Sequence, residues 1–95
     1  IIIENSEHER NSAGEKGGAI ASWGKLSIEE STFTSNSSGE NGGALYLYRT
    51  APNVPHLIKA TTFFSNQAKQ HGGAIFLDSG APLDIKDSSF QNNSA

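Results

Sequence analysis

The side chains best suited to acid–base chemistry in this 95-residue chain are three aspartates near its C-terminal end, Asp78, Asp84 and Asp87. Cleavage of a glycosidic bond needs two carboxyl groups held close together across that bond. Asp84 and Asp87 lie at different positions of a repeating unit, so nothing in the sequence makes them converge. Aspartates between strands are most often turn formers. We therefore predict no catalytic residue.

Histidine and cysteine are the other residues that would hold a metal or carry out covalent chemistry. The histidines His8, His56 and His71 fall at three different positions of the repeat, whereas a metal needs ligands that converge. The chain contains no cysteine, which excludes a disulfide framework and thiol catalysis. It also carries no calcium-loop or phosphate-loop motif. We expect neither a metal nor a cofactor.

Charge and hydropathy exclude two further classes of partner. The formal net charge is −3, and no cluster of basic residues is present to neutralise the phosphates of a nucleic acid. No apolar run approaches the length of a membrane span. The sequence therefore predicts no nucleic-acid partner and no membrane insertion by this segment.

Two short phrases recur along the chain, and they decide the fold. The first is a pair of glycines followed by alanine and then isoleucine or leucine, at residues 17–20, 42–45 and 72–75. The second runs from phenylalanine to an asparagine three positions later, at residues 33–36, 63–66 and 90–93, with 8–11 as a weaker copy. Such self-similarity at a near-constant period is the signature of a stacked repeat protein.

The repeating units span residues 1–25, 26–55, 56–82 and 83–95. Their lengths differ only after the Gly-Gly-Ala phrase, which places a variable loop on one face of the stack. Each unit opens with an alternation of apolar and polar residues, as at Leu26 and Ile28, and we expect about three short strands per unit and no helix. One unit cannot bury its apolar side alone, so the units must stack.

We therefore predict an all-β fold, a parallel β-helix of about three and a half coils, with the right-handed winding that parallel crossovers prefer. The chain starts inside an expected strand at Ile1 and stops inside the fourth unit at Ala95, and we interpret it as a single β-helix segment of a longer protein. Further coils of that protein are then expected as its neighbours.

Equivalent residues of successive coils should lie directly above one another. An internal aromatic stack is expected from Phe33, Phe63 and Phe90. An amide ladder, which satisfies its own hydrogen bonds while buried, is expected from Asn11, Asn36, Asn66 and Asn93. Turns with a positive φ or a close backbone approach are expected at Gly17, Gly18, Gly42, Gly43, Gly72 and Gly73. All three sets are interpreted as structural.

The two phrases resemble the repeats of the polymorphic outer membrane proteins of chlamydiae, which are autotransporter adhesins. The resemblance covers nearly the whole chain, although His8 replaces the phenylalanine in the first unit. It implies a right-handed parallel β-helix displayed at the cell surface, with motifs that contribute to adhesion. It also implies an extracellular or cell-surface location and a host-cell protein, matrix protein or glycan as partner.

Outward-facing aromatic residues are the candidate contact surface. If Ile20 points inward, its alternate neighbours point outward and place four aromatic side chains on one face: Trp23, Tyr46, Tyr48 and Phe76. Such rings would stack on sugars or anchor a protein partner. The alternative is that a loop at residues 49–55 or a neighbouring domain covers them.

Two asparagines lie in sequons for N-glycosylation, Asn36 and Asn92. Asn36 belongs to the inward ladder and should be inaccessible. Asn92 should face solvent, and it would carry a glycan in a eukaryotic secretory context.

Three functions stay open at this point. The first is a non-catalytic extracellular module that acts as an adhesive surface and structural spacer. The second is a structural subunit of an extracellular filament or appendage, in which the ends continue into further coils. The third is a fragment of a carbohydrate-active β-helix enzyme, which rests on fold-level analogy alone.

Overall fold

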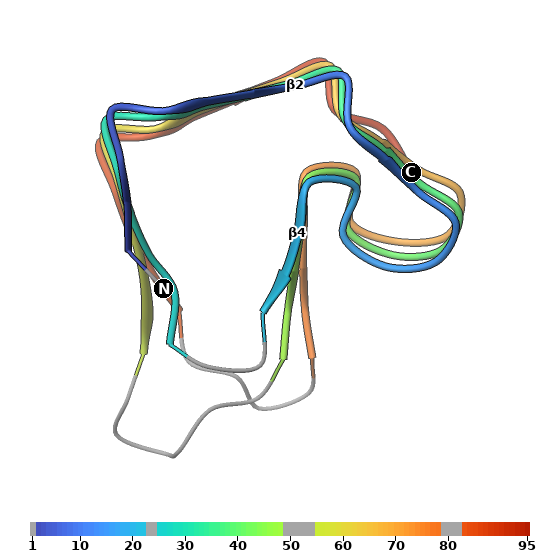
Figure 1. Cartoon of the computed structure of the whole chain (residues 1–95), viewed down its shortest axis with the longest axis horizontal. Coiled ribbons are helices and arrows are strands. Elements are labelled where there is room, and N and C mark those ends of the chain that lie inside the picture. Colours follow the sequence, from blue (N-terminus) through green and yellow to red (C-terminus); the bar gives the residue numbers. More distant parts are fainter. Residues whose placement is uncertain (1, 23–24, 49–54, 79–82) are drawn as a thin grey trace.

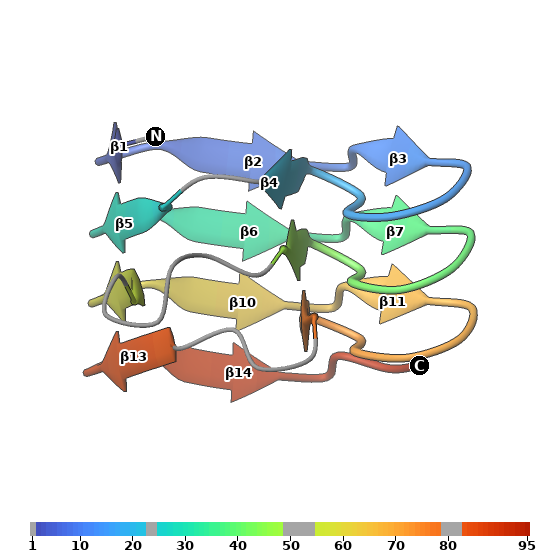
Figure 2. The same cartoon turned by 90° about the horizontal axis from the view of Figure 1, so that it is seen from below.

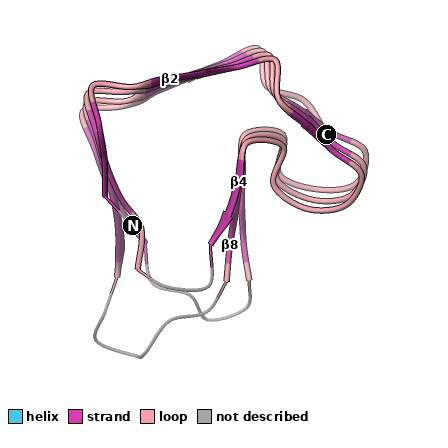
Figure 3. Cartoon of the chain, viewed as in Figure 1, coloured by secondary structure: helices cyan, strands magenta, loops and turns pink. Residues whose placement is uncertain are grey.

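A computed structural model describes residues 2–22, 25–48, 55–78 and 83–95 of the chain, and these residues form short strands and turns without a helix (Figure 3). The first coil contains β1 (Ile2–Glu4), β2 (Glu7–Glu9), β3 (Ser12–Ala13) and β4 (Ile20–Ser22). The second contains β5 (Ser27–Glu29), β6 (Thr32–Thr34), β7 (Ser37–Ser38) and β8 (Leu45–Leu47). The third contains β9 (His56–Lys59), β10 (Thr62–Phe64), β11 (Gln67–Ala68) and β12 (Ile75–Leu77), and the fourth β13 (Leu83–Lys86) and β14 (Ser89–Gln91).

Each of the first three coils thus has four strands, where the sequence predicted about three. The additional strand is the two-residue β3, β7 or β11, which follows the asparagine of the second phrase. Its serine, alanine and glutamine residues carry no strand propensity of their own. The strand exists because the coil above and below supplies its hydrogen bonds, a tertiary effect that overrides local propensity.

Four parallel sheets run along the stack, in the orders β1-β5-β9-β13, β14-β10-β6-β2, β11-β7-β3 and β12-β8-β4 (Figure 2). Equivalent residues pair directly: Ile3 with Ile28, Ile28 with Ile58, and Ile58 with Ile85. Viewed along the stack from the first coil, the chain winds clockwise as it recedes, so the β-helix is right-handed (Figure 1). The predicted fold class is confirmed.

Two corners of every coil turn through left-handed backbone conformations. The first corner has φ between 49° and 51° at Asn5, Glu30, Ala60 and Asp87. The second has φ between 54° and 56° at Arg10, Ser35, Ser65 and Asn92. Residues other than glycine rarely adopt such angles, so the stacking of the sheets on each side must hold these corners in place.

The glycine pair begins the return of the chain toward β4, β8 or β12, after a bulge that leaves the coil beyond β3, β7 or β11 (Figure 1). The first glycine has a positive φ, as at Gly42, where it is 73°. The second lies against the neighbouring coil, because a Cβ atom on Gly43 would collide with the carbonyl oxygen of Gly73. The pair therefore needs glycine for two different reasons.

The core lies inside the coil and is built from inward-facing residues of three sheets. Ile28, Ile58, Leu45 and Leu47 are at most 1% exposed, and they pack with Phe33 and other buried residues into one cluster. The described part of the chain contains no helix that could span a membrane.

Candidate functional site

The amide ladder runs through all four coils, and its buried amide groups form hydrogen bonds with one another and with the backbone. Nδ2 of Asn36 donates to Oδ1 of Asn66 at 3.0 Å and to the carbonyl oxygen of His8 at 2.9 Å, and the backbone N–H of Asn36 donates to the same Oδ1 at 3.0 Å. Asn66 repeats this pattern toward Asn93. Asn36 and Asn66 are fully buried, so these amides hold the coils together and are not accessible to a ligand.

The aromatic stack lies next to the ladder inside the coil. The Phe33 and Phe63 rings stack with centroids 5.0 Å apart, and Phe63 and Phe90 stack at 4.8 Å. The ring of His8 takes the phenylalanine position in the first coil and stacks on Phe33 at 4.6 Å. Phe33 and Phe63 are fully buried, whereas Phe90, in the fourth coil, is 41% exposed.

A third column, of hydroxyl groups, was not recognised in the sequence. Each hydroxyl donates to the carbonyl oxygen two residues earlier, at 2.9 to 3.0 Å. In the second, third and fourth coils the hydroxyl oxygen also accepts the backbone N–H of the equivalent residue in the preceding coil, at 3.2 to 3.5 Å. The column contains Ser6, Ser31, Thr61 and Ser88. This column could have been predicted from the sequence, because all four residues occupy the same position of the repeating unit.

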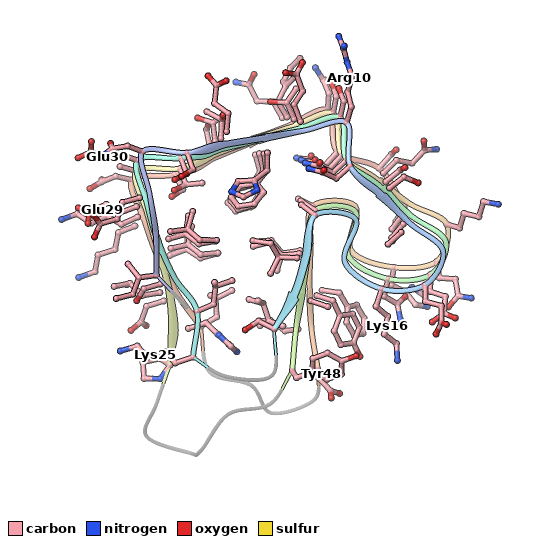
Figure 4. All side chains as sticks on the ribbon, viewed as in Figure 1. Arg10, Lys16, Lys25, Glu29, Glu30 and Tyr48 are labelled. Carbon is pink, nitrogen blue, oxygen red and sulfur yellow. The ribbon has the colours of Figure 1, made fainter. Side chains whose placement is uncertain are left out.

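Three aromatic side chains gather outside the coil, beside β4, β8 and β12, where Figure 4 labels Lys16 and Tyr48. The ring of Tyr46 lies 5.1 Å from that of Phe76 and 4.6 Å from that of Tyr48. Nζ of Lys16 lies over the Tyr46 ring at 5.2 Å from its centroid, a cation–π contact. In the first coil Ala21 pairs with Tyr46, and its small side chain leaves this space to Lys16.

The prediction of an exposed aromatic face is therefore wrong for Tyr46, which is 5% exposed. The rings of Tyr48 and Phe76 and the Lys16 side chain cover it. Burial, together with the nearby Asp78 carboxylate, raises the pKa of the Tyr46 phenol, which keeps the phenol neutral. Tyr48 and Phe76 are half-buried. Trp23, the fourth residue of the predicted face, lies outside the described residues.

His56 is fully buried between coils, a role that its place in the sequence did not reveal. Its Nδ1 accepts the backbone N–H of Leu26 at 3.1 Å, and its Nε2 lies 2.9 Å from the carbonyl oxygen of Tyr48. These bonds fix the neutral tautomer that carries hydrogen on Nε2. His56 pairs in register with Leu83, so it joins two coils within an otherwise apolar column.

The aspartates and histidines, the residue types that could act in catalysis or hold a metal, lie apart from one another. Asp84 lies on β13 and Asp87 at the positive-φ corner after it, while Asp78 follows β12 in a different sheet. His71 is exposed, and its backbone N–H donates to Oδ1 of Asn41 at 3.1 Å. Among the described residues no three of His, Cys, Asp and Glu come together as a metal site. Asn92, the accessible sequon residue, is exposed.

Two segments of the chain, residues 30–48 and 60–78, match the model of the Chlamydia polymorphic membrane protein repeat. These two segments are therefore similar to repeats of this family. No curated protein and no solved structure matches the chain.

The two matched segments cover the same part of the coil in successive coils. Each runs from a positive-φ corner, at Glu30 or Ala60, to the residue after β8 or β12. It thus contains one phenylalanine of the stack, one asparagine of the ladder and one glycine pair. The remaining strand, β5 or β9, and the segment of variable length lie outside the matched residues.

Proposed function

We propose that the chain is a non-catalytic module of an extracellular or cell-surface adhesin, in which the β-helix serves as a rigid spacer and presents contact surfaces. The observation that carries this proposal is the continuous amide ladder, whose two buried members, Asn36 and Asn66, lie in the segments that match the polymorphic membrane protein repeat. The repeat family supports a surface location, and the ladder supports a mechanical role.

The rigidity follows from what a slip between coils would cost. A shift of one residue would withdraw Oδ1 of Asn66 from the two donors of Asn36. Each unsatisfied buried polar group costs about 1–3 kcal/mol. The same one-residue shift would also separate the Phe33 and Phe63 rings. The stack therefore holds outward side chains of successive coils at a fixed spacing of about 4.8 Å.

The contact surfaces are expected on outward positions that differ from coil to coil. Tyr48 and Phe76 are half-buried aromatic residues on one such surface, and aromatic rings supply large contact areas at low entropic cost. The partner would be a host-cell or matrix protein or a glycan.

The test is adhesion of beads coated with the protein to cultured epithelial cells and to extracellular matrix. The intact protein should bind, and Tyr48→Ala should weaken binding while leaving the β-sheet circular dichroism unchanged. A variant that breaks the ladder, Asn66→Ala, should lose binding in proportion to its loss of folded protein. Folded protein that binds neither cells nor matrix would contradict the proposal.

A further inference from the structure

A groove lies along the outer surface of the sheet formed by β3, β7 and β11, away from the aromatic residues. Its volume is about 360 Å³, within the range of small-ligand sites of roughly 300–1,000 Å³. The residues that matter for its chemistry are Ser12, Ser37, Gln67, Gly14, Gly39 and Lys69.

The groove is lined by a row of hydrogen-bonding side chains that have no partner in the part of the chain that the structure describes. Ser12 pairs with Ser37, and Ser37 with Gln67, in register. Their inward neighbours Ser38 and Ala68 are buried, so this row faces outward. None of the three side chains makes a hydrogen bond with a described residue, unlike the inward hydroxyl column, in which every hydroxyl is bonded. The row is therefore available to a ligand.

The charge of the groove is positive although the chain as a whole is acidic, with a formal net charge of −3. Lys69 is the only charged residue among those that line it, and it is exposed. The two ion pairs within the described residues, Arg10 with Glu9 and Lys59 with Glu29, do not include it. A ligand with an anionic group would find here a cation that forms no ion pair with a described carboxylate.

The floor of the groove exists because two coils have glycine where the third has lysine. Gly14 and Gly39 precede Lys69 at the position after the short strand. A Cβ atom on Gly39 would collide with the carbonyl oxygen of Gly14, so Gly39 must remain glycine. A Cβ atom on Gly14 would meet no atom within 4 Å. Position 14 therefore opens onto the groove and accepts a side chain without disturbing the coil.

We infer that this groove binds an acidic saccharide, with the carboxylate or sulfate of the sugar at Lys69 and the sugar hydroxyls along the row of Ser12, Ser37 and Gln67. Lysine binds such anions as a point charge. Hydroxyl and amide groups repeated at about 4.8 Å suit a polyhydroxylated chain better than a peptide, for which this groove offers no apolar pocket. The inference deepens the proposed adhesive function and rests on it only for its biological setting.

Binding should be measured by titration calorimetry with defined oligosaccharides: a hyaluronan tetrasaccharide, a heparin tetrasaccharide and the neutral chitotetraose, with a hexaglutamate peptide as the competing class. At least one of the acidic saccharides should bind, about tenfold or more tightly than chitotetraose, and more weakly as salt rises. Lys69→Gln, which removes the charge but keeps a polar side chain, should reduce that binding about tenfold, the loss expected for one charge-assisted contact.

Position 14 supplies a matched pair of variants in which only the charge differs. Gly14→Lys should strengthen binding of the acidic saccharide several-fold, and Gly14→Glu should weaken it by a similar factor, while both retain the thermal stability of the parent. Equal binding by the two variants would overturn the inference. Equal affinity for chitotetraose, or tighter binding of hexaglutamate, would overturn it as well, as would no binding of any probe by the folded protein.

The same variants separate this inference from the proposed function. If Lys69→Gln loses saccharide binding but still adheres to cells, the groove stands and the adhesive contact lies elsewhere. If cell adhesion is intact and the parent binds no acidic saccharide, the groove is refuted and the adhesin proposal is unaffected.

Discussion

The inward and outward columns of this β-helix follow opposite rules. Inside the coil the amide ladder and the hydroxyl column each keep one chemical type through all four coils, and the aromatic stack departs from phenylalanine at His8. Outside, the equivalent positions change from coil to coil: Gly14, Gly39 and Lys69 share one outward position. Inward side chains contact their own equivalents above and below, so a foreign side chain would leave a void or an unpaired polar group. Outward side chains meet solvent and are free to acquire binding chemistry.

Adjacent phenylalanines on β10 provide the largest test of this comparison. Phe63 is fully buried in the aromatic stack, whereas Phe64 is 38% exposed. Phe63→Ala should lower the free energy of unfolding by about 4 kcal/mol, because it creates a cavity between two rings. Phe64→Ala should change it by less than about 0.5 kcal/mol. Urea denaturation of both variants measures the difference, and similar losses would show that the inward column has no special role.

The amide ladder should give the next largest effect. Asn66→Ala would remove the acceptor of two donors on Asn36 and the donor to the carbonyl oxygen of Phe33. We expect a loss of about 3 kcal/mol, less than the sum of the individual penalties because water can enter the space left by the side chain. Gln67→Ala, at the neighbouring exposed amide, should cost under about 0.5 kcal/mol. Equal midpoints in urea would argue that the buried amides are dispensable.

The sequence predicts the inside of this molecule much better than the outside. The pairing of Ile28 with Ile58 follows from the spacing of the two phrases, because stacked coils must align their repeats. The burial of Tyr46 did not follow, since it depends on Lys16 reaching across from another coil. The groove was missed for a similar reason: Gly14 has no side chain, and its role is visible only when its neighbours are in place.

The corners refine the comparison, because there an outward residue is constrained by its backbone instead of its contacts. Ala60 is exposed but has φ = 49°, a conformation that costs a residue with a Cβ atom roughly 1–2 kcal/mol. Ala60→Gly should therefore stabilise the protein by about 0.5 kcal/mol, after allowing for the greater entropy of glycine in the unfolded chain. Ala21→Gly, at an exposed strand position whose φ is not positive, should destabilise it by about 0.5–1 kcal/mol. Opposite shifts of the two thermal midpoints would show that backbone conformation sets the limit at the corners. A loss of stability in Ala60→Gly would mean that the stacked sheets already absorb the strain of the left-handed turn.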